Sequence, residues 1–531
     1  MEEQKPAQRE KHQHDPGRNQ LDPRRFFYIG RRLLAGCRID FAKQWVTPQI
    51  SNQLLALGAE RQVAEQAASM LRGEPINRSE DRAVLHSALR GGAPNVSAEI
   101  TATVNDTLQR MRGFAEDIRS GRRRGFTGKA FSDVVHIGIG GSHLGPELVT
   151  SALRDFATTS LRVHFVANID ANELHDALAG LNPETTLFIV VSKSFGTLET
   201  KVNANSARSW FLERTAAPLA IADHFVGVTT NIEAAAEFGL NPDNLLPMWD
   251  WVGGRFSLWS AVGLPILLSI GTEHHQAFLD GAREVDLHFA DAAPEANVPL
   301  LSALYGIWNY NFLGAGSLAV LSYDERLGLL PDYLQQLEME SNGKSVSQQG
   351  DPVGVHTMPI LWGGTGTRGQ HAYHQLLHQG NRSFTADIIL PLQNGHVDPD
   401  AHRKLAANAL AQSSALLTGR SAGESLALAR ERGQPDSFAA HYEMPGNHSH
   451  SLIYFQAVTP ETLGALIAAY EHKTFFLAQM LGINAFDQWG VELGKELATA
   501  LLPVVKGDAP AAGRDSSTAG LVEALARLRG D

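Results

Sequence analysis

The fold class of this chain is indicated most strongly by Thr186-Leu187-Phe188-Ile189-Val190-Val191-Ser192-Lys193-Ser194-Phe195-Gly196-Thr197. Its first six residues are apolar or β-branched throughout, which is typical of a parallel strand buried on both faces. Similar runs occur at Val134–Ile139 and Leu161–Val166, and helix-like segments separate the three. Strands that alternate with helices predict a doubly wound α/β unit of about 170 residues.

A second alternating region begins near residue 300. The strands predicted there are Ser317–Ser322, Val355–Leu361, Phe384–Leu390 and Ser451–Ala457. Residues 40–115 have helical spacing, with one helix near Ile50–Leu57 and a second near Asp81–His86. The C-terminal part is predicted to be helical over Glu461–Met480, Trp489–Leu501 and Thr518–Arg529. The polar residues 1–24 are expected to form a disordered tail.

Composition excludes several classes of protein. The chain has 531 residues and a formal charge of −12, which argues against a general nucleic-acid binder. The single cysteine, Cys37, cannot form an intrachain disulfide and suits a reducing compartment. The uncharged run Leu300–Tyr323 is interrupted by glycines and asparagines, so we do not expect a membrane span. No signal peptide is evident, and we expect a cytoplasmic location.

A glycine-rich loop, Gly138-Ile139-Gly140-Gly141-Ser142, follows the first predicted strand. Glycines allow a ligand to approach the backbone, and the N-terminus of a helix favours an anion. The loop does not fit the dinucleotide pattern, because His143 stands where the third glycine should be. A tight structural turn is the alternative interpretation.

The loop Ser192–Thr197 places three hydroxyls and the ammonium group of Lys193 within six residues. These groups can surround a phosphate dianion with charge-assisted hydrogen bonds. Hydroxyls that only cap a helix are the alternative. Two such loops in one α/β unit favour an anion site.

A third polar cluster lies in Tyr333-Leu334-Gln335-Gln336-Leu337-Glu338-Met339-Glu340-Ser341-Asn342-Gly343-Lys344. Its apolar residues have helical spacing, so the cluster is predicted at the end of a half-buried helix. A carboxylate held there, out of bulk water, can act as a general base. The alternative is a solvated helix end with ordinary surface charges.

Further candidates are spread along the chain. Arg255 follows two glycines between aromatic residues, which suits either a buried ion pair or the stabilisation of developing negative charge. His371 is expected to start a helix that carries His374 and His378 on the same face. That spacing could mimic a metal site, but an acid–base role for His371 with the other two histidines packing is preferred.

Other histidines and one lysine complete the set. The pair His274-His275 and the triplet His448-Ser449-His450 are expected on the surface or in loops. Lys495 ends the stretch Phe486–Lys495 inside an apolar helical stripe. It could reach solvent, donate a proton to a ring oxygen or bind an anion.

Taken together, these motifs resemble the glucose-6-phosphate isomerase (phosphoglucose isomerase) family. The resemblance runs from about residue 75 to 498 and includes Asn77–His86, Gly138–Ser142, Ser192–Phe195, Gly253–Ser260, Tyr333–Lys344, Gly369–Ala372 and Gln488–Lys495.

The resemblance implies an α/β protein with two sugar-isomerase-type (SIS) αβα subdomains and parallel-rich sheets. The expected organisation is a tail (1–24), a helical N-terminal region on the second subdomain (25–115), two SIS subdomains (116–292 and 293–480) and a C-terminal helical arm (481–531). It also implies an intertwined homodimer with active sites at the interface.

The resemblance also implies roles for single residues. Glu340 matches the family's base, Arg255 the arginine beside it, and His371 and Lys495 the groups that open the sugar ring. The implied substrate and phosphate contacts are Gly141, Ser142, Ser192, Lys193, Ser194, Thr197, Gln336 and Gln488. In the family the histidine comes from the neighbouring subunit.

The implied reaction is the reversible isomerisation of glucose 6-phosphate to fructose 6-phosphate in glycolysis and gluconeogenesis, through a cis-enediolate. It needs no cofactor and no metal, and neither a nucleic acid nor a membrane partner is expected. The rival interpretations are a non-catalytic sugar-phosphate-binding SIS regulator and a metal-dependent sugar isomerase. The regulator would not need Glu340, Arg255, His371 and Lys495 together.

Overall fold

The computed structural model describes residues 31–93, 95–158, 160–395, 398–510 and 513–529. Residues up to Ala485 form one compact unit, and Phe486–Asp531 form a second. The tail expected at 1–24 lies outside the described residues. The predicted bounds of the regions between 25 and 531 stay predictions.

Within the described residues, the first sheet of the larger unit consists of parallel strands in the order β4-β3-β5-β6-β7. The strands are β3 (Asp133–Ile137), β4 (Arg162–Val166), β5 (Thr186–Val191), β6 (Phe225–Thr229) and β7 (Leu245–Pro247). β5 coincides with the predicted run, and every residue of β5 is buried. β6 and β7 were not predicted from the sequence.

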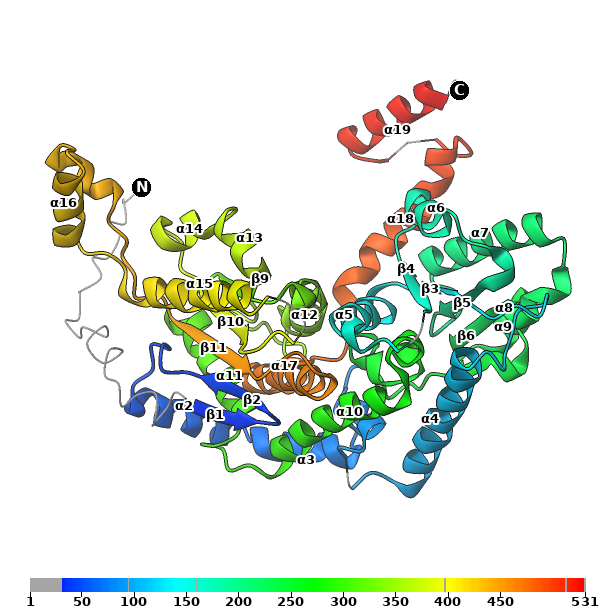
Figure 1. Ribbon diagram of the computed structural model, residues 1–531, viewed down its shortest axis with the longest axis horizontal. Helices are drawn as coiled ribbons and strands as arrows, with labels where there is room; N and C mark the ends of the chain where they lie inside the picture. The colour runs from blue at the N-terminus through cyan, green and yellow to red at the C-terminus, as the bar shows by residue number, and fades with distance from the viewer. Residues whose placement is uncertain (1–30, 94, 159, 396–397, 511–512, 530–531) are drawn as a thin grey trace. The chain divides into compact units, whose positions relative to one another are not determined.

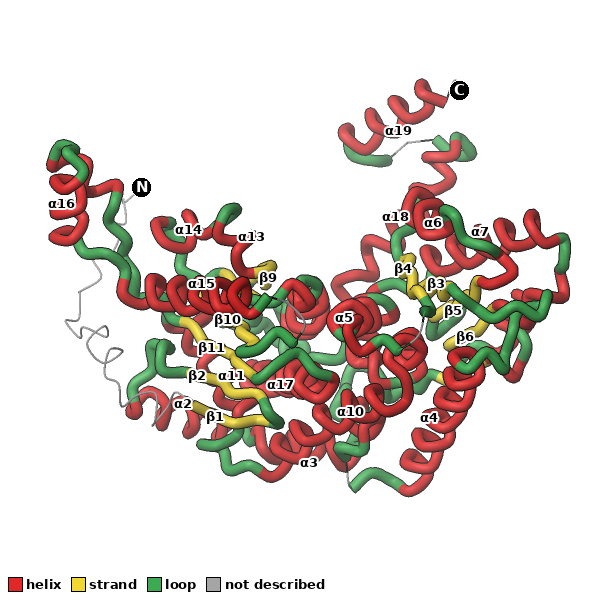
Figure 2. Tube along the Cα trace, in the orientation of Figure 1, coloured by secondary structure: helices red, strands yellow, loops and turns green. Residues whose placement is uncertain are grey.

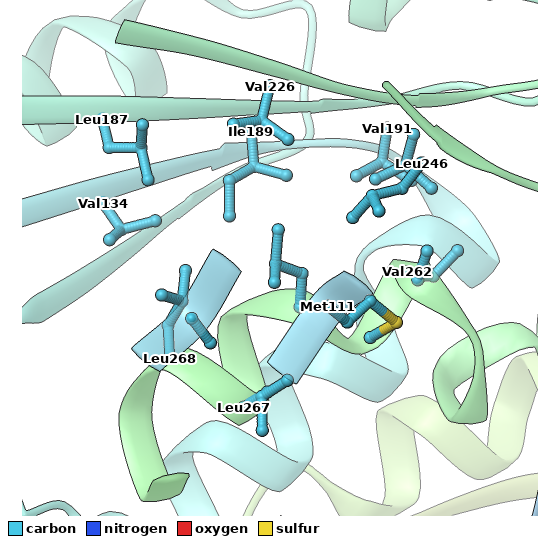
Figure 3. Close-up of a cluster of buried hydrophobic side chains, with 14 of the residues drawn as sticks. Met111, Val134, Leu187, Ile189, Val191, Val226, Leu246, Val262, Leu267 and Leu268 are labelled. Carbon is cyan, nitrogen blue, oxygen red and sulfur yellow. The ribbon is translucent and has the colours of Figure 1, made fainter. Parts of the chain in front are cut away.

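Helices cover both faces of this sheet, which explains the apolar strands (Figure 1). The helices are α4 (Ala98–Arg119), α5 (Leu144–Ala152), α6 (Ala171–Leu178), α7 (Leu198–Thr215), α8 (Ile221–His224), α9 (Ile232–Phe238) and α10 (Leu264–Asp291). α4 and α10 bury one face, where Met111, Leu267 and Leu268 meet Val134 and Ile189 (Figure 3). α6 to α9 bury the other.

The strand order brings two loops together. The chain leaves β3 to pair β4 on one side and then returns to β5 on the other side of β3. At such a switch point, the loops after the two central strands border a crevice at their carboxyl ends, where α/β proteins bind ligands. Here these loops are Gly138–Ser142 and Ser192–Thr197.

The second sheet has the order β1-β2-β11-β10-β8-β9. Its strands are β1 (Arg31–Leu34), β2 (Cys37–Asp40), β8 (Ser317–Ser322), β9 (Ile360–Thr365), β10 (Thr385–Pro391) and β11 (His450–Phe455). β8 to β11 are parallel, and β2 joins β11 in the antiparallel direction. Figure 2 shows these strands enclosed by helices. The prediction of two αβα subdomains with parallel-rich sheets is therefore confirmed.

The helices of this region pack on both faces of the second sheet. α14 (His374–Gln379) and α15 (Pro399–Thr418) cover one face. α11 (Val298–Ile307) and α17 (Pro460–Leu481) lie against the other. The remaining helices are α2 (Pro48–Glu60), α3 (Val63–Arg72), α12 (Leu330–Leu334), α13 (Gly366–Gln370) and α16 (Ala422–Glu431), with α18 (Glu492–Lys506) and α19 (Ser516–Arg529) in the smaller unit.

Three local predictions were wrong. In the region 25–115, which was expected to be helical, Arg31–Leu34 and Cys37–Asp40 form the hairpin β1–β2. No helix forms over Asp81–Leu85, because Asp81 adopts a left-handed conformation with φ of 51°. The strand expected at Val355–Leu361 starts only at Ile360, directly after Pro359, which has no N–H to donate to the sheet.

The uncharged run Leu300–Tyr323 is divided between α11, a π-helical turn and β8. In the part of the chain that the structure describes, no helix is both long and apolar enough to cross a membrane.

Candidate active site

The polar stretch after α12 forms a π-helix, Gln335–Glu340. Such a helix is rare and is frequently found at functional sites. It turns its two carboxylates in different directions. Glu338 is completely buried, whereas the side chain of Glu340 retains 25% of its exposure. Of these two carboxylates, only that of Glu340 is partly exposed, and its role as a general base stays a prediction.

Arg255 lies beside that carboxylate. Its Nη1 is 3.2 Å from Glu340 Oε2, and its side chain is only 2% exposed. Its Nε donates to Ser341 Oγ at 2.6 Å, and its Nη2 donates to the Ala485 carbonyl. The guanidinium group is thus fixed by several partners and presents a preorganised positive charge next to Glu340.

The glycine loop Gly138–Ser142 approaches both the segment that carries Arg255 and the π-helix that carries Glu340. A Cβ added to Gly141 would lie 2.0 Å from the carbonyl oxygen of Gly254, so only glycine permits this contact. A Cβ added to Gly140, whose φ is 58°, would lie 3.0 Å from Gln336 Nε2. These glycines are needed for a tight turn and close backbone packing, which was the alternative interpretation of the loop. They also bring Gly141 and Ser142 close to Arg255 and Gln336.

The loop Ser192–Thr197 leads into α7. Ser192 Oγ donates to Thr197 Oγ1 at 3.2 Å, while Ser194 is exposed. Thr197, at the start of α7, makes no side-chain capping bond, so its hydroxyl does not occupy the N-terminal N–H groups of the helix. A helix N-terminus with free N–H groups attracts anions. The arrangement favours the anion site over simple helix capping.

Lys193, the second residue of this loop, is held in place by its side chain and its backbone. Its Nζ lies 3.0 Å from Asp250, and this hydrogen bond holds the pKa of the Asp250 carboxyl below its ordinary value. Its backbone carbonyl accepts bonds from the Thr229 and Thr230 hydroxyls. The lysine is about one-third exposed, so its ammonium group remains accessible to an anion.

The histidines near residue 371 differ from the prediction. His371 does not start a helix, because it follows the last residue of α13 and precedes α14. It is exposed, whereas His374 and His378 both contact Gln412 Oε1, at 3.1 and 2.7 Å. The two latter histidines pack as expected. Among the described residues, no group of three or more His, Cys, Asp or Glu side chains could hold a metal ion.

Two other histidine predictions were wrong. His275 lies in α10 and His450 in β11, and both are fully buried. Burial lowers the pKa of each to about 3, so both are neutral. Histidine is often buried when neutral, and its polar side chain alone does not predict a loop.

Gln488 and Lys495 belong to the smaller unit. Lys495 is exposed, and its Nζ pairs with Glu492 Oε1 at 2.9 Å. Their expected contact with the substrate stays a prediction.

A group of buried charges near the site was missed from the sequence. Glu471, His472 and Lys473 lie in the middle of the apolar helix α17 and are almost completely buried. Charged residues are rarely buried unless they are paired. Two charged residues that flank a histidine in the middle of an apolar helix were a signal that could have revealed the group.

The chain is similar to known proteins over almost its whole length. A family model described as phosphoglucose isomerase matches residues 40–522. A glucose-6-phosphate isomerase from Shewanella sp. (strain MR-7) is 47% identical over 509 residues, covering 94% of this chain and 93% of that protein.

Solved structures also resemble this chain over most of its length. The crystal structure of a glucose-6-phosphate isomerase from Chlamydia trachomatis has a TM-score of 0.82 and 33% identity, covering 96% of this chain and 95% of that one. A hypothetical protein from Thermus thermophilus has a TM-score of 0.66 and 26% identity, covering 88% of this chain and 99% of that one.

Proposed function

Because the chain belongs to the phosphoglucose isomerase family, we propose that it interconverts glucose 6-phosphate and fructose 6-phosphate. It is an aldose–ketose isomerase, which is an intramolecular oxidoreductase. The observation that carries this function is the half-buried carboxylate of Glu340 beside the fixed guanidinium of Arg255. A base and a fixed positive charge are what proton transfer through an enediolate requires.

The reaction begins with opening of the sugar ring, for which we propose His371 and Lys495 as acid–base groups. Glu340 then removes the proton from C2, which leaves a cis-enediolate. Arg255 stabilises the negative charge, and Glu340 returns the proton to C1. Gln336, on the same π-helix as Glu340, and Gln488 are proposed to contact the sugar.

For the phosphate group we propose the crevice between the loops after β3 and β5. Gly141 and Ser142 border it from one loop, and Ser192, Lys193, Ser194 and Thr197 border it from the other. The switch point of the sheet and the start of α7 support this position. A non-catalytic sugar-phosphate regulator is not favoured, because binding alone does not need the pair of Arg255 and Glu340.

A coupled assay tests the function directly. The purified chain is expected to convert fructose 6-phosphate to glucose 6-phosphate at the same rate with and without a chelator. Absence of isomerisation would refute the proposal. Activity that disappears with the chelator would identify a metal-dependent isomerase instead.

Replacing Lys193 by alanine is expected to raise KM about tenfold with a smaller effect on kcat. The lost charge-assisted hydrogen bond is worth roughly 1.5–3 kcal/mol, reduced here by partial exposure. Steady-state kinetics measure the change. The matched control is Lys129→Ala. Lys129 pairs with Glu184, and both residues precede the amino ends of β3 and β5, whereas Lys193 follows the carboxyl end of β5. An unchanged KM for Lys193→Ala would place the phosphate elsewhere.

We also propose that the chain acts in the cytoplasm as a homodimer in which His371 serves the partner's site. Inactive His371→Ala and Glu340→Gln proteins should then complement each other after subunit exchange. Half of the randomly paired dimers are mixed, and each of these has one intact site, so activity should reach about a quarter of wild type. The exposed position of His371 supports this arrangement. Activity that stays at the parental level after confirmed exchange would show that each site is built from one chain.

A further inference from the structure

The two segments that carry Arg255 and Glu340 are both attached to one helix, α17. Arg255 belongs to the short 3₁₀ helix Gly254–Trp259. At the end of that helix, Trp259 Nε1 donates to Glu471 Oε1 at 2.7 Å. Glu471 is itself held by Arg90 Nη1 at 2.6 Å, and all three side chains are buried. The hydrogen bond from Trp259 to Glu471 therefore fixes the position of the Arg255 segment relative to α17.

The Glu340 segment is attached to the same helix two and three residues later. Lys473 Nζ lies 2.9 Å from Glu338 Oε1, and both side chains are buried. Asn342 Nδ2 donates to the Thr474 carbonyl at 3.0 Å. These bonds lie two residues before and two residues after Glu340, so they enclose the residue proposed as the base.

Glu338 and Glu340 are two positions apart, and residues at that spacing do not share one face of a helix. Glu338 therefore directs its carboxylate inward while Glu340 directs its own towards Arg255. Within the described residues, Glu338 Oε2 has no hydrogen-bond partner, so Lys473 is the group that compensates the buried charge. Asp387 lies 3.9 Å from Lys473, farther than Glu338.

We propose that the buried pair of Lys473 and Glu338 is a positioning device that fixes the Glu340 carboxylate relative to Arg255. The proposal rests on the proposed isomerase function. Without Lys473, the buried Glu338 carboxylate must move towards another donor or take up a proton. Either change shifts the π-helix, while the backbone segment that carries Arg255 stays anchored through Trp259 and Glu471. A displacement of about 1 Å at a reacting group can lower the rate by about 10²-fold.

The test uses Lys473→Met and the double variant Glu338→Gln/Lys473→Met in the full-length protein. The double variant removes both charges of the pair, so Glu338 is not left as a buried carboxylate without its lysine. It therefore tests the positioning role even if Lys473→Met alone does not fold. In each folded variant, kcat should fall about 10- to 10²-fold with KM within about threefold of wild type. The kinetic isotope effect on the conversion of glucose 6-phosphate deuterated at C2 should increase, because removal of the C2 proton becomes more rate-limiting.

Asp133→Asn is the matched control. Asp133 is a buried carboxylate paired with Arg162 and His164, at the start of β3 and away from the loop that follows that strand. It should lower the midpoint of thermal unfolding without changing kcat or the isotope effect.

Two outcomes would overturn the positioning role. One is a folded double variant with kcat within twofold of wild type. The other is an equal fall of kcat in Asp133→Asn, which would reveal a general loss of stability. Failure of the isomerase function itself is distinguishable, because wild-type protein would then show no turnover in the same assay.

Discussion

Glu340→Gln is expected to fold, to bind sugar phosphate and to lose nearly all isomerisation. The amide keeps the shape of the side chain but cannot accept a proton from C2. Loss of a general base typically costs about 10²–10⁴-fold in rate, and here proton transfer is the whole chemical step. The decrease should appear in kcat, since we propose that the phosphate binds in a different part of the site.

Two measurements make this result specific. Binding of a phosphorylated sugar acid, followed by calorimetry, should be retained in Glu340→Gln. Glu184→Gln is a suitable control, because Glu184 is 33% exposed and paired with a cation, as Glu340 is paired with Arg255. Turnover near the wild-type level in folded Glu340→Gln would show that another group is the base.

Arg255→Lys is expected to lower kcat by about 10²–10³-fold, the usual effect of removing one preorganised charge donor. Lysine keeps the positive charge but cannot contact Ser341, Ala485 and Glu340 together, as the planar guanidinium group does. Steady-state kinetics measure the loss.

The buried Arg326, which pairs with Asp324 and Asp155, gives the control Arg326→Lys. That change should affect stability more than turnover. A kcat of Arg255→Lys within threefold of wild type would mean that a group other than Arg255 stabilises the negative charge of the enediolate.

The sequence predicted those parts of the fold whose signals are local. The strand Thr186–Val191 is apolar throughout because both faces of the sheet are covered, and its bounds were predicted correctly. The hairpin β1–β2 could not be predicted in this way, since β2 is held by pairing with β11, more than 400 residues later.

The candidate site shows the same limit. The chemistry of Glu340 and Arg255 was recognisable from their motifs, but the separate directions of Glu338 and Glu340 depend on the π-helix and on Lys473. The place of His371 between two short helices also required the three-dimensional structure.

The attachment of the Arg255 and Glu340 segments to α17 has a consequence during synthesis of the chain. Glu471 follows Trp259 by 212 residues, and Lys473 follows Glu338 by 135. The first sheet is complete at Pro247 and can form early on the ribosome, since domains generally fold as units from the N-terminal side. At roughly 5–20 residues per second, Trp259 then waits roughly 10–40 s for its partner on α17. During that interval the nascent protein grows from about half to most of its length, and the Arg255 and Glu340 segments are not yet held together.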